Sequence, residues 1–130
     1  MDKKRVLIVD DEKDIVETIQ FNLELEGLEC LVAYDGEEAL LKAKRENPDL
    51  ILLDIMLPKI NGYKIARLLK FDELYKHIPI IMLTARTQQT DIKIGEETGA
   101  DEYVTKPFDM DMLVALVKKY CSYSATDSHR

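Results

Sequence analysis

The sequence predicts an α/β fold, a doubly wound parallel sheet of five strands in the order 2-1-3-4-5. Short apolar runs alternate five times with helical patterns, which is typical of parallel strands joined by right-handed crossovers. Several runs are continuously apolar, as expected for central strands that are covered on both faces. The runs are Arg5–Val9, Leu28–Ala33, Asp49–Leu53, Pro79–Leu83 and Glu102–Thr105.

Four of the helical patterns repeat apolar side chains every three or four residues, as an amphipathic helix requires. These positions are Ile15, Ile19 and Leu23, then Ala39, Leu40 and Ala43, then Ile65, Leu68 and Leu69, and last Leu113, Leu116, Val117 and Tyr120. Gly27 is expected to end the first helix. Asp35 with Glu38 resembles a capping box, and Asn61 and Asp109 are expected to begin the third and fifth helices.

The fourth helix is the weak element of the pattern. It is expected from about Gln88 to Thr98, before Gly99, and offers only Ile92 and Ile94 as large apolar anchors. A helix held by so little burial is expected to have low local stability. A packing accident would explain this, but a mobile element beside a reactive site is also what a switch requires.

Length and charge narrow the classes of function. The chain has 130 residues, which suits one domain, expected over residues 4–121 with a polar, disordered tail at 122–130. Its net charge of -7 without a basic patch argues against direct nucleic acid binding and against an anionic membrane surface. No apolar run is long enough to span a membrane, and no signal peptide is visible, so a cytoplasmic location is expected.

Cys30 and Cys121 lack a metal-binding spacing and are expected to be buried thiols.

Reactive groups follow four of the predicted strands. Asp10 and Asp11 follow the first strand, Asp54 the third and Thr84 the fourth, and Lys106 follows the fifth. Because parallel strands end at the same edge of a sheet, these groups are expected to meet in the crevice where such sheets bind ligands. Clustered carboxylates repel one another unless a proton or a cation joins them.

A hard divalent cation suits such a cluster, because Mg²⁺ binds one or two carboxylates together with water and phosphate oxygens. Carboxylates, Mg²⁺, a lysine and a hydroxyl together meet the needs of in-line phosphoryl transfer, in which Asp54 could itself be the nucleophile. Each group alone has a plainer explanation: an Asp-Asp pair often caps a helix, and Lys106-Pro107 indicates a turn that is compatible with a cis peptide bond. Their joint occurrence at four strand ends favours the reactive site.

The chain resembles the receiver domains of two-component response regulators (the CheY-like superfamily) from about Lys4 to Tyr120. The matching stretches are Val6–Glu12, Leu52–Pro58, Gly62, Leu83–Ala85 and Gly99–Phe108. The resemblance implies a flavodoxin-like (βα)5 architecture. It also implies that a sensor histidine kinase or a histidine phosphotransfer protein phosphorylates Asp54, as part of signal transduction or a phosphorelay. The protein would then be no enzyme beyond its own phosphorylation and slow dephosphorylation.

The same resemblance implies the roles of the site residues. Asp11, Asp54 and the backbone carbonyl of Met56 would ligate Mg²⁺ or Mn²⁺, and Asp10 would act through water. Lys106 would pair with Asp54 and then with the phosphoryl group. Two switch residues would respond to the aspartyl phosphate: Thr84 would move toward it, and Tyr103 would turn inward behind it. A half-buried surface tyrosine is the plainer interpretation of Tyr103.

Two further positions are expected to tune the loss of the phosphoryl group. Met56 and Arg86 each lie two residues past a site residue, and in the family such positions set how fast water attacks the acyl phosphate. Met56 is apolar and Arg86 is cationic, so neither is an obvious general base. We therefore expect slow to moderate self-dephosphorylation.

Two outputs remain open within the family. The chain could be a stand-alone receiver that acts on a downstream protein, or the excised receiver of a DNA-binding response regulator whose output domain is missing here. Residues 99–108 resemble the winged-helix class, whose receivers form phosphorylation-dependent homodimers through the fourth helix, fifth strand and fifth helix. Leu116 stands where that class usually has an arginine, and Met112 where an acid is common. The polar dimer is therefore in doubt, and Leu116 could belong to an apolar contact face.

Two other classes fit less well. A flavodoxin-like FMN carrier would need a phosphate-binding loop rich in Ser, Thr and Gly, whereas residues 9–12 are acidic. A dehalogenase-type phosphatase also forms an aspartyl phosphate, but has an Asp-x-Asp motif after its first strand. Flavin absorbance would favour the carrier, and turnover of phosphomonoesters would favour the phosphatase.

Overall fold

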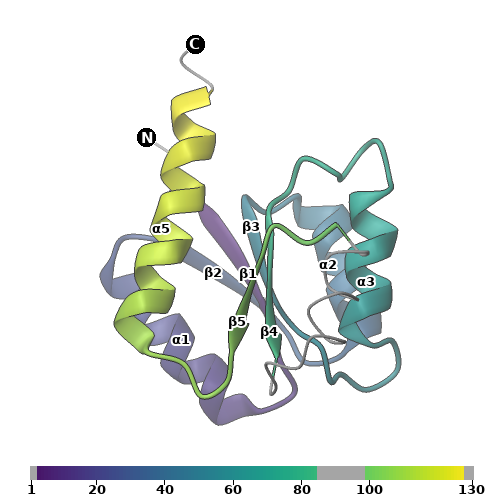
Figure 1. The fold of residues 1–130 in the computed structure, drawn as a ribbon, viewed down its shortest axis with the longest axis horizontal. Coiled ribbons are helices and arrows are strands. Elements are labelled where there is room, and N and C mark those ends of the chain that lie inside the picture. The colour runs from purple at the N-terminus through teal and green to yellow at the C-terminus, as the bar shows by residue number, and fades with distance from the viewer. Residues whose placement is uncertain (1–2, 85–98, 128–130) are drawn as a thin grey trace.

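The computed structural model describes residues 3–84 and 99–127, which form a parallel five-stranded sheet with helices on both faces (Figure 1). The strand order is β2-β1-β3-β4-β5, as predicted, and every neighbouring pair is parallel. The strands are β1 (Arg5–Val9), β2 (Glu29–Ala33), β3 (Leu50–Asp54), β4 (Ile80–Thr84) and β5 (Glu102–Thr105). The described helices are α1 (Lys13–Leu25), α2 (Gly36–Glu46), α3 (Gly62–Lys70) and α5 (Met110–Asp127).

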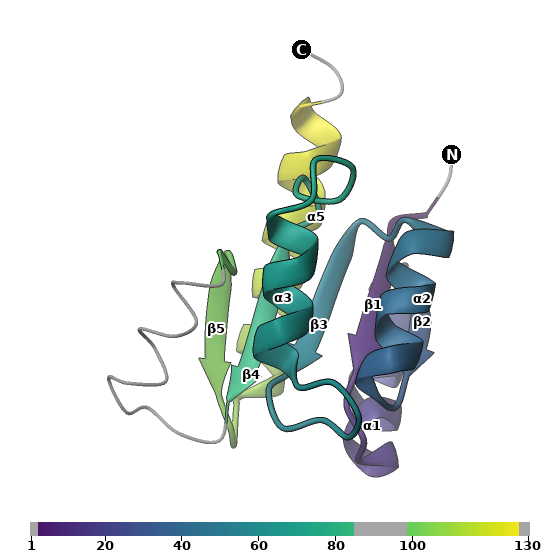
Figure 2. The same ribbon diagram turned by 90° about the vertical axis from the view of Figure 1, so that its right-hand side faces the viewer.

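The two faces of the sheet carry separate cores. Helices α1 and α5 cover one face, and α2 and α3 cover the other (Figures 1 and 2). Alternate residues of each central strand divide between the cores: Ile8 packs with α1 and α5, whereas Leu7 packs with α2 and α3. All five residues of β3 and of β4 are buried, which explains why these runs are continuously apolar up to Asp54 and Thr84.

The helix caps largely follow the sequence prediction. The side chains of Asp35, Asn61 and Asp109 each accept a hydrogen bond from the backbone N–H three residues further on. The capping box differs in one contact, because Glu38 accepts from the N–H of Tyr34 rather than of Asp35. These caps begin α2, α3 and α5 just beyond the carboxyl ends of the strands.

The structure differs from the sequence predictions at Leu68 and at the end of α5. Leu68, expected on the apolar face of α3, is 45% exposed. Residues 122–127 continue α5, whereas a disordered tail was expected from residue 122. The expected fourth helix lies outside the described residues. In the part of the chain that is described, no helix has the length and apolar character needed to cross a membrane.

Candidate phosphoryl-transfer site

Asp54 is the last residue of β3 and is only 5% exposed. The β3–β4 register sets it beside Leu83, next to the end of β4. Its Oδ1 atom accepts a long hydrogen bond of 3.4 Å from the N–H of Met56. A carboxylate with little contact with solvent therefore ends the central strand of the sheet.

The neighbouring strand supplies two more carboxylates. Asp10 follows β1 and is fully buried, and its Oδ1 accepts a hydrogen bond of 2.9 Å from the N–H of Glu12. Asp11 is exposed. Each of Asp10, Asp11 and Asp54 offers a carboxylate oxygen, and these three oxygens lie within 4.8 Å of one another. The structure thus brings together the three acids that the sequence pointed to.

Lys106 reaches this cluster from the chain beyond β5. Its Nζ atom donates a hydrogen bond of 2.8 Å to Asp10 Oδ2, whereas its distances to Asp54 Oδ1 and Glu12 Oε1 are 3.6 and 4.0 Å. The expected pair with Asp54 is therefore present but secondary to the bond with Asp10. The Lys106-Pro107 peptide bond is cis, as the sequence allowed.

The crowding of charge changes two pKa values. Burial, followed by the negative charge of Asp10, raises the pKa of Asp54 from 3.8 to about 6, although Lys106 and the Met56 N–H oppose the rise. Burial acts to lower the pKa of Lys106, but its hydrogen bond to Asp10 and the nearby carboxylates outweigh that effect and raise it. Without a further cation, the ionised form of Asp54 is thus poorly stabilised.

The loop after Asp54 packs tightly against its backbone. A Cβ atom on Gly62 would lie 2.4 Å from the carbonyl oxygen of Asp54 and 2.8 Å from Cα of Ile55, so no larger residue fits without a shift. The Gly62 N–H also donates to the carbonyl of Ile55 at 2.9 Å. Gly62 is one of the positions that carry the resemblance to receiver domains, and this close approach of backbones explains why a glycine is needed there.

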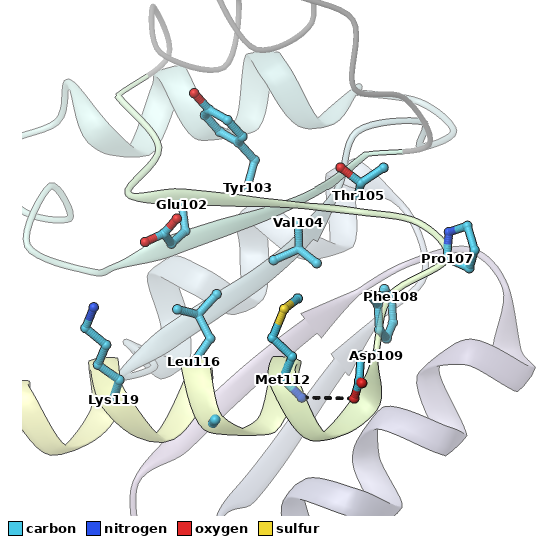
Figure 3. Close-up of a pocket in the computed structure, with 11 residues that line it drawn as sticks. Glu102, Tyr103, Val104, Thr105, Pro107, Phe108, Asp109, Met112, Leu116 and Lys119 are labelled. Carbon is cyan, nitrogen blue, oxygen red and sulfur yellow. Dashed lines mark hydrogen bonds between the residues drawn. The ribbon is translucent and has the colours of Figure 1, made fainter.

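The two proposed switch residues occupy different places. Thr84 ends β4, is 6% exposed and pairs in register with Thr105. Tyr103 is half-buried and packs against the core beneath α2 and α3, on the side of β5 that faces away from α5 (Figure 3). Thr84 therefore belongs to the strand ends around Asp54, whereas Tyr103 does not.

Of the two residues expected to tune dephosphorylation, the structure describes Met56. The side chain of Met56 is 75% exposed, although its N–H contacts Asp54. Arg86 lies outside the described residues. Glu12 was not among the site residues predicted from the sequence, and it contacts the cluster twice: its N–H donates to Asp10 at 2.9 Å, and its carboxylate lies 4.0 Å from the Lys106 Nζ atom.

The donor set fits a hard divalent cation. Three carboxylates converge from the ends of two adjacent strands, and burial, followed by the charge of Asp10, raises the pKa of Asp54, so a cation would stabilise its ionised form. Mg²⁺ prefers such oxygen ligands and retains several waters, which the exposed Asp11 would allow. The residues present are thus compatible with the metal that the sequence suggested.

The family of this chain follows from its similarity to known proteins. Residues 6–118 match the model of the response regulator receiver domain, and the chain belongs to that family. It is thus a receiver domain of the response regulators that act in two-component signalling.

Individual relatives agree with this assignment. Over 115 residues the chain is 49% identical to the alkaline phosphatase synthesis transcriptional regulatory protein PhoP of Bacillus subtilis, a match that covers 88% of the chain and 47% of PhoP. A response regulator from Chloroflexus aurantiacus has a similar structure, with a TM-score of 0.87, 36% identity and coverage of 93% of this chain and 99% of that one. DrrB of Thermotoga maritima, an OmpR/PhoB homologue, also has a similar structure, with a TM-score of 0.85 and 31% identity. That match covers 95% of this chain and 54% of DrrB. The chain thus spans about half the length of PhoP and of DrrB.

Proposed function

We propose that Asp54 is the phosphoacceptor of this receiver. The observation that carries the proposal is the position of Asp54: a nearly buried carboxylate between two other acids and Lys106, at the carboxyl edge of a parallel sheet. An oxygen of Asp54 would attack the phosphorus of a phosphohistidine. A P–O bond then forms as the P–N bond breaks, and the imidazole leaves.

The residues around Asp54 would each contribute to that transfer. Asp11, Asp54 and the Met56 backbone carbonyl would bind Mg²⁺ or Mn²⁺, with Asp10 acting through water. The metal, when bound, supplies positive charge that orients the phosphoryl oxygens and offsets their developing charge. Lys106 would balance charge first at the carboxylates and then at the phosphoryl group, which it can reach because it already lies 3.6 Å from Asp54.

The phosphoryl donor is proposed to be a sensor histidine kinase or a histidine phosphotransfer protein. An open cleft of about 480 Å³ adjoins Lys106, and its apolar lining includes Ile15, Pro107 and Phe108. A donor that buries these side chains would bring its phosphohistidine to the edge where Asp54 lies. We also propose a cytoplasmic location, since Cys30 and Cys121 are both free thiols.

Phosphorylation is proposed to act through Thr84 and Tyr103. The added charge and acceptor oxygens would draw the Thr84 hydroxyl toward Asp54, and Tyr103 would turn inward behind it. The face that responds would include the expected fourth helix, β5 and α5. Between β5 and α5 lies a hollow of about 740 Å³, lined in part by Met112 and Leu116 (Figure 3).

That face could contact a downstream protein or, after phosphorylation, a second receiver. The hydroxyl of Tyr120 donates a hydrogen bond of 3.1 Å to the carboxylate of Glu102 on β5. This acid therefore already has a partner within its own chain. Together with Leu116, this favours apolar contacts over cross-dimer ion pairs. The identity to PhoP, a transcriptional regulatory protein, supports a second proposal, that this chain is the receiver part of a DNA-binding response regulator. Catalysis beyond its own phosphorylation and slow dephosphorylation is not proposed.

Phosphorylation of the chain by acetyl phosphate or by a phosphorylated kinase, with Mg²⁺, tests the proposal by intact-mass measurement. One phosphoryl adduct is expected for the native chain and none for Asp54→Asn. Asp109→Asn is the matched control, because asparagine also caps a helix and Asp109 lies outside the cluster. Absence of an adduct with every donor, or an adduct that survives in Asp54→Asn, would contradict it. Turnover of phosphomonoesters would instead favour the remote alternative, an aspartyl-phosphate phosphatase.

The lifetime of the adduct is a separate proposal. We expect slow to moderate loss, because neither Met56 nor Arg86 supplies a general base. Decay within seconds that is unchanged by substitution of both residues would refute this expectation while leaving Asp54 as the phosphoacceptor.

A further inference from the structure

The outer surface of α3 and the turn after it expose large apolar side chains. Leu68, Phe71 and Leu74 are 45%, 68% and 72% exposed. Helix α3 lies on the outside of the sheet, on the face opposite α1 and α5 (Figure 2). Single exposed apolar residues are normal in soluble proteins, but three within seven positions indicate a contact surface.

Charged residues bracket this apolar surface. A shallow hollow of about 840 Å³ lies on it, and its lining residues, which we call the α3 face, are Lys64, Arg67, Leu68, Phe71, Asp72 and Glu73. The bases come first along the chain and the acids last, with Leu68 and Phe71 between them. The Arg67 guanidinium lies 5.9 Å from the centre of the Phe71 ring, so the basic end and the apolar middle are continuous.

Part of this charge order opposes the helix dipole. Lys64 lies in the first turn of α3, which has no acidic residue, and Asp72 directly follows its C-cap, Phe71. Helix α2 shows the ordinary order, with acids in its first turn and bases in its last. The placement of Lys64 therefore has no explanation in the local stability of α3, whereas that of Arg67 in the last turn does. Asp72 has a local role in the turn after the helix, where its side chain accepts a hydrogen bond of 2.9 Å from the N–H of Leu74.

From these observations we infer that the α3 face binds a second copy of this chain in an antiparallel arrangement. A two-fold axis would set the basic end of one α3 face against the acidic end of the other, with Leu68 and Phe71 of both copies between them. Each copy then offers the same patch, as a two-fold interface requires. The charge order makes the surface complementary to itself, which is the reason to prefer a second copy over another protein. Glu73 also pairs with Lys76 at 2.8 Å, but both side chains are exposed, so this pair is weak and leaves Glu73 able to contact a partner.

Most of the α3 face lies away from the phosphoryl-transfer site, and only Lys64 is near the start of the helix. Gly62 at the start of α3 packs on Asp54, whereas Phe71, Asp72 and Glu73 follow the far end of the helix. One helix face and one turn make a small interface, so weak and concentration-dependent association is expected. The contact does not require phosphorylation, and its test is independent of the role proposed for Asp54.

Sedimentation velocity of the unphosphorylated chain, from about 10 μM to about 1 mM, tests the inference. The native chain is expected to change from monomer to dimer across this range. Leu68→Glu should weaken association at least about tenfold, because it removes apolar burial from the middle of the interface. Circular dichroism should show native-like folding, since Leu68 is exposed and lies outside the buried cores.

Charge reversals identify the self-complementary geometry. Arg67→Glu and Glu73→Arg should each abolish the homodimer, whereas an equimolar mixture of the two variants should form a heterodimer, because opposite charges then face each other at both ends. The double variant should dimerise with itself again. Glu17→Arg, on the exposed side of α1, is the control that should leave association unchanged.

A chain that stays monomeric up to about 1 mM would overturn the inference. So would a dimer that is indifferent to Leu68→Glu and to the charge reversals but is lost when Leu116 on α5 is replaced. Loss of association in both single variants without its recovery in their mixture would likewise exclude the antiparallel pairing.

Discussion

The Lys106 ammonium group donates its shortest hydrogen bond to Asp10, at 2.8 Å, and lies 3.6 Å from Asp54. Asp10 is fully buried, and the Lys106 side chain is 17% exposed. Before any phosphoryl group or metal is bound, the lysine therefore neutralises Asp10 and leaves Asp54 as the less well balanced acid. Burial of Asp54, followed by the charge of Asp10, raises the pKa of Asp54, and the charge of Lys106 opposes this rise without cancelling it.

Removing the lysine should destabilise the metal-free protein. Lys106→Met leaves Asp10 buried without its cation, and loss of one partner of a buried pair costs about 3 kcal/mol. Urea unfolding at neutral pH measures the loss, and added Mg²⁺ should restore part of it by supplying positive charge. Lys118→Met is the matched control, because its pair with Glu26 at 2.7 Å is exposed and should contribute less than about 1 kcal/mol.

Replacing Asp54 should stabilise the metal-free protein in a pH-dependent way. The folded pKa of about 6 lies above the ordinary 3.8, so the folded state binds the proton more tightly and loses stability as pH rises from about 4 to about 6. The full shift corresponds to about 3 kcal/mol above that window. Asp54→Asn should therefore be more stable than the native chain at pH above about 7 and nearly equal to it below about 4.

Urea unfolding in the presence of a chelator, repeated across that pH range, checks this expectation. Asp109→Asn serves as the control, because the carboxyl of Asp109 lies outside the acidic cluster and asparagine preserves the cap. A stabilisation by Asp54→Asn that is the same at both ends of the range would show that charge is not its cause.

Both cysteines should resist alkylation in the folded protein. Burial, followed by the charges of Glu24 and Glu29, raises the pKa of Cys30 to about 12. Burial and the charge of Asp49 raise that of Cys121 to about 11. Because the thiolate is the reactive form, iodoacetamide at mildly alkaline pH should label neither residue until urea unfolds the chain. Rapid labelling of either cysteine in the folded state, detected by peptide mass mapping, would contradict the prediction.

The sheet and the location of the candidate site could be predicted because periodicity carries the needed information. Continuous apolar runs identify buried parallel strands, and the parallel order then brings Asp10, Asp54 and Thr84 to one edge. Capping residues predicted three helix starts for a similar reason, since the side chain of an Asp or Asn acts on its own backbone.

Features set by contacts distant in the sequence could not be predicted in this way. The preference of Lys106 for Asp10 depends on a difference of less than 1 Å between the distances from its Nζ atom to two competing carboxylates, 2.8 Å to Asp10 and 3.6 Å to Asp54. Leu68 follows the helical period but lies at the margin of the buried stripe, and no pattern says how much of α3 the sheet covers. Helix α5 continues to Asp127, and the sequence did not indicate this because residues 122–127, apart from Tyr123, are small and mostly polar, a composition that also suits a tail.

The close packing of Gly62 on Asp54 gives a final prediction. A methyl group in Gly62→Ala would lie 2.4 Å from the Asp54 carbonyl oxygen, so the loop must move, at a cost of about 1–3 kcal/mol in unfolding free energy. Displacement of the Asp54 backbone should also slow phosphorylation by acetyl phosphate, followed by intact-mass measurement over time. Gly27→Ala is the control: its positive φ of 85° also makes alanine unfavourable, but it has open space and lies far along the chain from Asp54. Equal phosphorylation rates in the two variants would mean that Gly62 serves only the stability of the loop.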